Sequence, residues 1–201
     1  MKYLALAFVG VSSLLANSAQ AEEWYAGGAL LSIETDSGIS PVSGTATIDE
    51  KDSGFKVFIG RKIDENLSIE GFYVDYGEVR FTGNSGDLVS EDGVLYVLTA
   101  DNVVIKSDTS GIGVSVRYDI PVSSVFDIYA KLGLLRWDFE QTSTATGVAS
   151  QTVSESGTDT IFGIGVNFAA SDQFSIFVDY EMTEVDNDDT TVLGAGVAVN
   201  F

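Results

Sequence analysis

The chain has 201 residues, with no Cys, no His, and 30 acidic against 10 basic residues. Without Cys or His it has no thiol nucleophile, no imidazole base and no Cys- or His-ligated metal, so we expect no catalytic residue, no metal site and no cofactor. The net charge of −20 argues against a nucleic-acid partner, because phosphates require a basic face. The chain is 45% hydrophobic, with 21 Gly and 2 Pro, which favours a folded, strand-rich protein.

The first 21 residues have the features of an export signal. Lys2 supplies the positive charge, 3–15 is an apolar stretch, and Ala19 and Ala21 form a small-x-small cleavage site. We therefore expect a cleavable signal peptide over 1–21 and a mature domain over 22–201. The alternative is an N-terminal anchor or a buried helix. The mature part has no apolar run long enough for a spanning helix, so the exported chain is either soluble or crosses a membrane as strands.

Eight segments alternate between large apolar side chains and small or polar ones, which is the pattern of a β-strand. Each is 9 to 12 residues long. A tilted strand needs about 9–11 residues to cross a bilayer, whereas an ordinary strand has about 5–6. In chain order the predicted strands are 24–33, 54–63, 67–77, 111–120, 126–137, 160–168, 174–183 and 192–201.

The two faces of these strands differ in a way that favours a membrane barrel. In 174–183, for example, Phe174 and Val178 oppose Ser175 and Asp179. The second face is too small and glycine-rich for a wet surface but suits the inside of a narrow barrel. The predicted fold is all-β, an eight-stranded antiparallel up-and-down transmembrane β-barrel. A soluble barrel, with the large residues around a cavity, is the alternative.

Two places depart from this alternation. In the first strand, Gly27 and Gly28 precede the adjacent pair Leu30 and Leu31, which indicates a bulge or a sharp bend. In the fifth strand, Arg136 falls on the apolar side. It either extends to the lipid headgroups or lies beyond a bulge.

The lengths of the connections predict the orientation. In order they hold 20, 3, 33, 5, 22, 5 and 8 residues, so long and short alternate. Outer-membrane barrels have short periplasmic turns and long external loops. We therefore place the protein in the bacterial outer membrane, with both termini periplasmic and the four long loops extracellular. These loops contain 19 of the 30 acidic residues.

Two of the long loops have features of their own. In the 78–110 loop, two apolar runs, 94–98 and 103–105, flank 100–102 and predict a hairpin above the membrane or a binding element; strand extensions that pack on each other are the simpler alternative. The oxygen-rich run 186–189 could hold Ca²⁺, but it lacks EF-hand spacing, so we interpret it as a solvated loop tip.

Several short stretches, taken in their order and spacing, resemble the OmpA-type transmembrane barrel family over roughly 22–201. They are GFKVFIG (54–60), LSIE (67–70), YVDYG (73–77), YDIP (118–121), DIYAKLG (127–133) with Trp137, and the terminal Phe201. The resemblance implies a charge network inside the barrel. The family's larger members also have a C-terminal peptidoglycan-binding domain, which is not expected for a chain that stops at Phe201.

The positions that match this internal network are Glu70, Arg117, Lys131 and Asp179, and the alternation also places all four inward. A charge inside a narrow barrel is costly unless it is paired, and Glu70 and Arg117 lie at similar height on neighbouring strands, so we expect them to pair. Two positions depart from the family pattern: Asn167 replaces an acidic residue and Phe177 replaces a basic one.

The C-terminal strand ends in Phe201 after alternating apolar residues, which resembles the signal read by the outer-membrane barrel-assembly machinery. An ordinary closing strand is the alternative. Beyond that machinery, the expected partners are outer-membrane lipids and lipopolysaccharide. The sequence does not identify a partner for the external loops.

We therefore expect an integral outer-membrane barrel that is not an enzyme and acts structurally and through surface interactions of its four acidic external loops. The alternative is a small ion or solute channel through the polar lumen. That alternative is weakened because an eight-stranded barrel is usually filled by its own side chains.

Overall fold

The computed structural model describes residues 24–185 and 188–201. The expected leader, 1–21, and the tip of the 186–189 run lie outside the described residues. No helix in the described part is long and apolar enough to cross a membrane. The strands of the described part are β1 (Trp24–Asp36), β2 (Ile39–Ser43), β3 (Thr47–Asp49), β4 (Lys51–Lys62), β5 (Leu67–Gly83), β6 (Leu88–Glu91), β7 (Val94–Val97), β8 (Val103–Pro121), β9 (Phe126–Ala145), β10 (Val148–Ala169), β11 (Phe174–Val185) and β12 (Asp188–Asn200).

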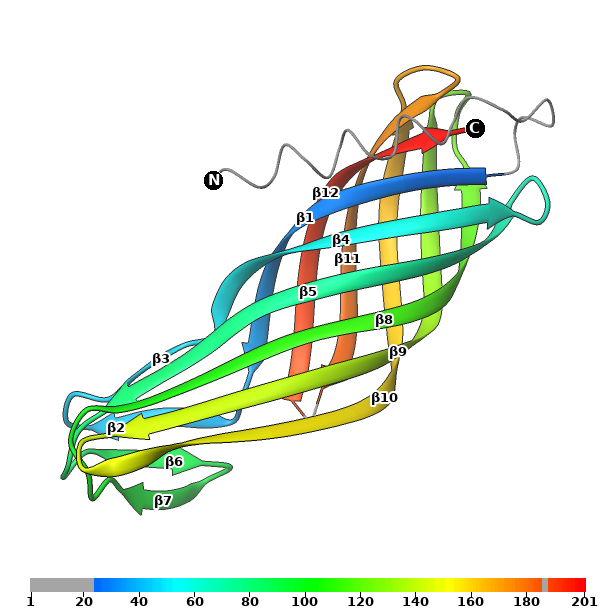
Figure 1. The fold of residues 1–201 in the computed structure, drawn as a ribbon. Coiled ribbons are helices and arrows are strands. Elements are labelled where there is room, and N and C mark those ends of the chain that lie inside the picture. Colours follow the sequence, from blue (N-terminus) through cyan, green and yellow to red (C-terminus); the bar gives the residue numbers. More distant parts are fainter. Residues whose placement is uncertain (1–23, 186–187) are drawn as a thin grey trace.

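Eight of these strands close into an antiparallel barrel (Figure 1). Their order is β5-β4-β1-β12-β11-β10-β9-β8, and β5 pairs again with β8 to complete the ring. The first and last strands meet along their length, from Tyr25 opposite Asn200 to Asp36 opposite Asp189. The predicted eight-stranded up-and-down barrel is confirmed.

The apolar side chains of the barrel wall point outward. Leu132 on β9 is 61% exposed and Leu193 on β12 is 55% exposed, whereas their neighbours Lys131 and Val192 are buried. The same alternation runs along every barrel strand, so an apolar belt surrounds a filled interior. Because the large apolar side chains face outward, the structure excludes a soluble barrel whose apolar side chains surround a central cavity.

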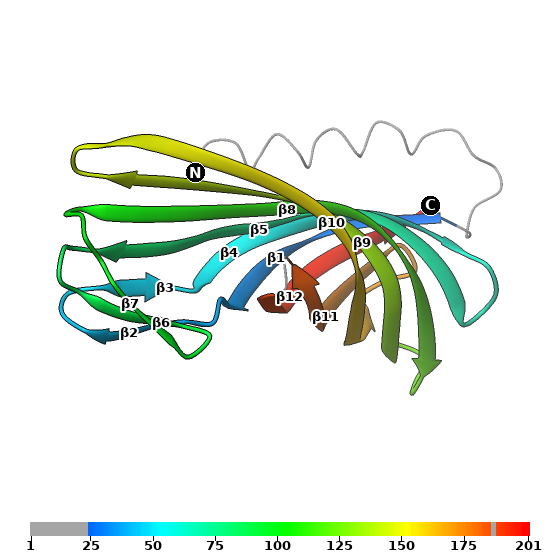
Figure 2. The ribbon, with the colours of Figure 1, turned by 90° about the horizontal axis from the view of Figure 1, so that it is seen from below.

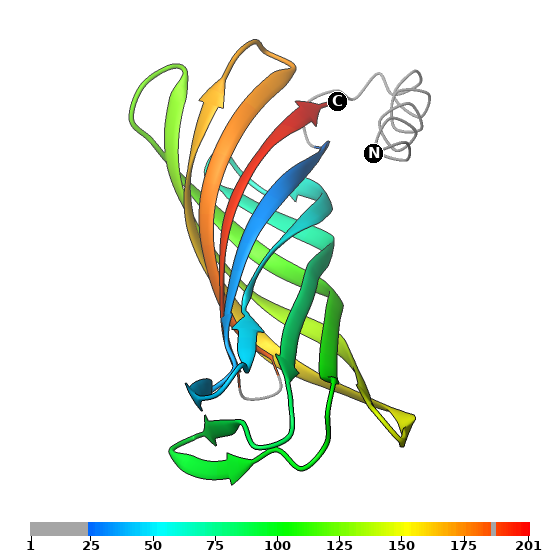
Figure 3. The same ribbon diagram turned by 90° about the vertical axis from the view of Figure 1, so that its left-hand side faces the viewer.

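The predicted strands all occur, but four of them continue far beyond their predicted ends. β5, β8, β9 and β10 have 17, 19, 20 and 22 residues, whereas β1, β4, β11 and β12 have 12 or 13. The longer strands project from one side of the barrel at the end opposite the termini (Figures 1 and 3). The extra length was not predicted because these residues lack the apolar alternation that lipid imposes.

A second, three-stranded sheet, β2-β6-β7, lies at the projecting end (Figure 2). A hairpin does form within 78–110, but its partners differ from those expected. Val94–Val97 pairs with Leu88–Glu91, and β6 in turn pairs with β2 of the first long loop. The 103–105 run instead belongs to β8 and pairs with β5. The predicted hairpin between 94–98 and 103–105 is therefore wrong, whereas the alternative of a strand extension holds for 103–105.

The expected bulges are absent from the described strands. β1 keeps a continuous register on both sides, and a side chain at Gly27 would collide with Phe58, so this glycine makes room for an inward ring. Arg136 lies outward in an unbroken ladder. The irregularity in the wall occurs instead between Asp75 and Glu78, beside Gly77 at φ +75°. Glycine adopts that backbone conformation without steric cost.

Candidate functional site

The barrel interior contains a compact group of charged side chains that we call the lumen network. All four predicted residues belong to it, and each is buried. Two further residues, one acidic and one basic, join them. The lumen network consists of Lys56, Glu70, Arg117, Lys131, Asp179 and Glu181.

Lys131 lies at the centre of the network. Its Nζ is 3.3 Å from Glu70 Oε2, 3.2 Å from Asp179 Oδ2 and 3.8 Å from Glu181 Oε1. The same ammonium lies 5.1 Å from the centre of the Tyr129 ring, within the range of a cation–π contact. One cation therefore joins carboxylates from two different strands, β5 and β11.

Arg117 lies near the short-turn end of the network. Its guanidinium is 3.7 Å from Glu70, so the expected pair is present, but its closest contact is Asp119 at 2.6 Å. The guanidinium also lies 3.8 Å from the centre of the Tyr129 ring. Arg117 thus links Glu70 in the lumen to Asp119 near the short-turn end of β8.

Lys56 and Glu181 were not predicted as members of the network. Lys56 Nζ donates to both Glu181 oxygens at 2.7 Å. The signal was in the sequence, because 54–60 places Lys56 on the same face as Phe58 and Gly60. With these two, the six residues of the lumen network are three acids and three bases, so the network as defined carries no net charge.

Two tyrosines donate hydrogen bonds to the buried carboxylates. Tyr25 donates its hydroxyl to Glu70 Oε1 at 2.8 Å, and Tyr129 donates to Asp179 Oδ2 at 3.2 Å. Buried charges require such partners as well as a counter-charge. The tyrosines come from β1 and β9, so the network links strands from opposite sides of the ring.

The two positions that depart from the family pattern do not carry charge into this network. Phe177 is buried and packs edge-on against Phe58, with ring centres 5.6 Å apart. Asn167 donates to Asp127 Oδ2 at 3.4 Å, closer to the short-turn end. Aromatic rings therefore occupy lumen space beside the ions, which favours a filled barrel over an open pore.

At the long-loop end, Asp87 accepts hydrogen bonds from two segments of the chain. Asp87, just before β6, accepts hydrogen bonds from the backbone N–H groups of Thr45 and Asn84, both at 2.8 Å, and from the Thr45 hydroxyl at 3.0 Å. These backbone donors hold the pKa of Asp87 below its ordinary value. Asp87 therefore joins the first long loop to the second.

Phe201 follows the last residue of β12 and donates its backbone N–H to the carbonyl of Trp24 at 2.9 Å. The two ends of the described chain thus meet at the short-turn end of the barrel (Figure 1). No group of three or more Asp or Glu residues in the described part of the chain is arranged to hold a metal ion.

A closed eight-stranded barrel with an apolar outer belt and a charged, filled lumen defines the class of small outer-membrane barrels. A family profile described as outer membrane protein beta-barrel domain matches residues 4–201, and the chain belongs to this family. The protein is accordingly located in the bacterial outer membrane.

Two curated relatives are outer-membrane proteins that resemble this chain at low sequence identity. Outer membrane protein A of Shigella flexneri is 22% identical over 98% of this chain, and that of Salmonella typhi is 21% identical over 98%. The chain spans about half the length of these relatives, 54% in both cases.

Solved structures share the fold. The attachment invasion locus protein Ail of Yersinia pestis superposes with a TM-score of 0.55 at 12% identity, covering 90% of this chain and all of that one. The barrel domain of Pseudomonas aeruginosa OprF gives 0.53 at 11% identity, covering 90% and 100%. Neisserial surface protein A gives 0.51 at 18% identity, covering 90% and 99%.

Proposed function

We propose that this protein is a non-catalytic interaction barrel whose acidic long-loop end contacts partners outside the cell. The observation that carries the proposal is the folded structure at that end. Four strands project beyond the others, and the β2-β6-β7 sheet packs beside them instead of remaining as loose loops. Ordered loops on a rigid scaffold are a common location for binding.

The proposal requires the long-loop end to face outward. It is supported by the three short connections, 63–66, 122–125 and 170–173, which share the opposite end with both termini, as in other outer-membrane barrels (Figure 1). The chain has no Cys, so single substitutions provide clean labels. A membrane-impermeant maleimide should label Val94→Cys on intact cells but label Glu65→Cys only after lysis. The reverse pattern would overturn the orientation.

The charge of the loops favours basic partners. The long connections contain 19 of the 30 acidic residues, and complementary charge steers association. The relative Ail has been solved in complex with the heparin analogue sucrose octasulfate, which is a polyanion. For this chain we propose the opposite preference, since like charges repel.

A surface-binding experiment with the purified barrel tests this proposal. The full chain in phosphatidylcholine nanodiscs should bind immobilised poly-lysine and not immobilised heparin, and 0.5 M NaCl should weaken that binding because salt screens exposed charges. A variant with 84–102 replaced by Asn-Gly should bind poly-lysine more weakly while keeping its barrel. Equal binding of both surfaces, or no effect of the shortened loop, would refute the proposal.

The proposed lack of catalysis is supported by composition. The chain has no His and no Cys, so the common general base and the thiol nucleophile are both missing. The carboxylates of the lumen network are buried and engaged with cations and tyrosines. They therefore serve to fill and stabilise the barrel rather than to react with a substrate.

A narrow ion path is the second candidate function, and the charged lumen network is the observation that favours it. The path would have to pass Lys131, which contacts three carboxylates, and the packed rings of Phe58 and Phe177. We therefore propose that the native barrel gives no ion steps in a planar bilayer. Steps in the unmodified protein would favour the channel instead.

We propose lipopolysaccharide as a partner of the outer surface of the barrel wall. Arg136 is exposed at the loop-side edge of the apolar belt, two residues from Leu134, where it can reach the phosphates of lipopolysaccharide.

The alternating face of β12, with Leu193 and Val197 outward, supports recognition of this strand together with Phe201 by the assembly machinery.

A further inference from the structure

The projecting strands enclose space above the lumen network. β10 pairs with β9 from Val148 onward but with β11 only from Ile161 to Ala169, so its first half extends past the short β11–β12 side of the barrel. The β2-β6-β7 sheet faces this extension from the other side (Figure 2). The result is a one-sided mouth rather than a symmetrical rim.

A cavity of about 970 Å³ lies in this mouth, and we call it the mouth cavity. Its volume is at the upper end of the range for small-molecule sites, roughly 300–1,000 Å³. The four extended strands β5, β8, β9 and β10 and all three strands of the second sheet contribute to its lining, together with β3 and the ends of β1, β11 and β12. Its lining includes no residue of the lumen network, so it is separate from the ion-paired interior.

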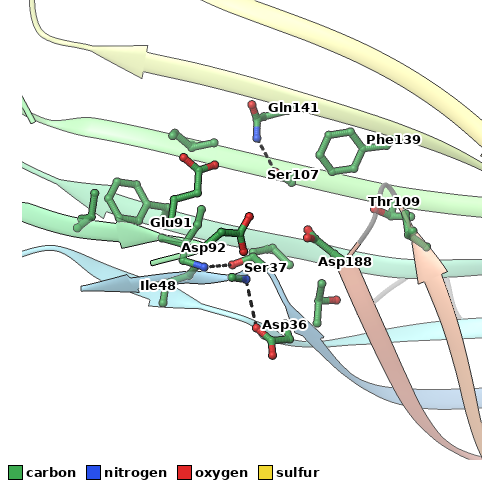
Figure 4. Close-up of a pocket in the computed structure, with 18 of the residues that line it drawn as sticks. Asp36, Ser37, Ile48, Glu91, Asp92, Ser107, Thr109, Phe139, Gln141 and Asp188 are labelled. Atoms are coloured by element: carbon green, nitrogen blue, oxygen red, sulfur yellow. Dashed lines mark hydrogen bonds between the residues drawn. The ribbon is translucent and has the colours of Figure 1, made fainter. Parts of the chain in front are cut away.

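The walls of the mouth cavity present apolar and polar surface in nearly equal shares. Phe81 and Val89 are buried there, and Phe139 packs against the buried core from the β9 side. Ile48 and Phe139 lie on opposite sides of the cavity in Figure 4. Such walls offer an organic molecule the contact area from which most binding energy comes.

Carboxylates are placed among these apolar side chains. Figure 4 shows Glu91, Asp92 and Asp188 around the same space as Phe139. The lining contributed by residues 24–185 and 188–201 includes neither Lys nor Arg. The acidic lining residues are Asp36, Glu91, Asp92, Glu155, Asp188 and Asp189.

The floor of the mouth cavity is closed by Tyr76. This side chain lines the cavity and is only 5% exposed, and its hydroxyl is buried beneath the cavity floor. Tyr76 therefore separates the mouth cavity from the ion-paired interior below it.

We propose that the mouth cavity binds a cationic amphipathic small molecule, an amine with an aliphatic or aromatic body. The ammonium would lie near Glu91, Asp92 and Asp188, and the apolar body would lie against Phe81 and Phe139. A neutral ligand would desolvate the carboxylates without compensation, and an anion would be repelled. This inference rests on the proposed interaction function and names the ligand class that the loop end accepts.

Matched ligands separate the roles of charge and apolar body. The full chain in phosphatidylcholine nanodiscs is titrated with 6-phenylhexylamine, 6-phenylhexan-1-ol, 6-phenylhexanoate and ethylamine, with empty nanodiscs subtracted. We expect the phenylhexylamine to bind at least about tenfold more tightly than the other three, because only it supplies both features. Equal binding of the alcohol or the carboxylate would overturn the inference.

Matched variants locate the site. Glu91→Gln with Asp92→Asn removes two lining charges and should weaken amine binding about fivefold or more, the scale of one close charge pair in water. Glu65→Gln with Asp172→Asn removes two exposed carboxylates from short turns at the opposite end and should leave binding unchanged. Equal affinity in both double variants would place the amine elsewhere and refute the mouth cavity.

The amine and poly-lysine experiments together distinguish a failure of the cavity inference from a failure of the proposed interaction function. If poly-lysine binding depends on 84–102 but the amine does not bind, the interaction function holds and only the cavity inference fails. If the amine binds and poly-lysine binding is unaffected by the loop deletion, the cavity stands as a ligand site and the broader proposal fails.

Discussion

Replacing Lys131 by Met tests whether the lumen network holds the barrel together. The Lys131 side chain is 4% exposed, and its ammonium contacts Glu70, Asp179 and Glu181 at 3.2–3.8 Å. Met occupies a similar volume without charge. The substitution therefore removes one positive charge from a buried group in which three acids balance three bases.

The contacts that survive the substitution set its expected cost. Glu181 keeps the 2.7 Å pair with Lys56, and Glu70 keeps Arg117 at 3.7 Å and the Tyr25 hydroxyl at 2.8 Å. Asp179 loses its contacting cation. Removing one partner of a buried pair costs about 3–5 kcal/mol, and with one carboxylate stranded we expect about 3 kcal/mol. At about 2 kcal/mol per molar urea, the unfolding midpoint should fall by roughly 1.5 M.

The assay is urea unfolding of the barrel in phosphatidylcholine vesicles, followed by tryptophan fluorescence. The matched control is Lys51→Met, which breaks a pair with Glu34 at 3.0 Å whose side chains are 70% and 61% exposed. Exposed pairs contribute about 0–1 kcal/mol, so this variant should hardly change. Adding Asp179→Asn to Lys131→Met should recover part of the loss. Equal midpoints for the two lysine variants would refute the role of the network.

Four other predictions follow from particular positions. Lys131→Met should also raise the ionic conductance in planar bilayers above that of the unmodified barrel, which we expect to be silent. Gly196→Ala should lower the unfolding free energy by about 1–3 kcal/mol, since a methyl there meets the backbone of β1, whereas Gly71→Ala, with open space around it, should be neutral or slightly stabilising by urea titration. Asp87 has a lowered folded-state pKa, so its stabilisation of the loops is fully present above its unfolded pKa of about 4 and is lost as the pH falls through the lower folded-state pKa; the amide protection factors of 44–46, which correct for the intrinsic exchange rate at each pH, should therefore decrease on acidification of the native chain, and Asp87→Ala should show low protection factors already at pH 7. Phe201→Ala should reduce the fraction of newly made protein that reaches the heat-modifiable, folded form in cells, without lowering the stability of the barrel that does assemble.

The alternation of side chains predicted the barrel and most of its interior. Wherever one face of a strand meets lipid and the other a narrow lumen, the two faces must differ in both size and polarity. Glu70, Arg117, Lys131 and Asp179 are therefore identifiable as inward from sequence alone, and the structure brings them together. Lys56 is not one of the family positions, although the same alternation places it on the inward face.

Other features could not be predicted from a single strand. The sequence places Arg117 inward, but its preference for Asp119 at 2.6 Å over Glu70 at 3.7 Å depends on side-chain reach within the folded ring. The pairing of β2 with β6 joins two loops that are 45 residues or more apart, and no local pattern specifies it. Gly27 was interpreted as a bulge, whereas it makes room for Phe58, which comes from the neighbouring strand.

The uneven strand lengths extend the loop end of this barrel beyond the apolar belt, and its binding properties arise there. Within the apolar belt, lipid requires large apolar side chains on the outer face of all eight strands. Above the belt both faces of a strand meet water, so the alternation of apolar and polar side chains is lost. There β10 runs 22 residues, with Ser154, Ser156 and Thr158 on its outer face. The first half of β10 pairs with β9 alone, so its other side is a sheet edge, and polar and acidic residues such as Glu155 oppose edge-to-edge aggregation. The same acidic residue lines the mouth cavity, so the charge that keeps the exposed edge soluble also selects a cationic ligand.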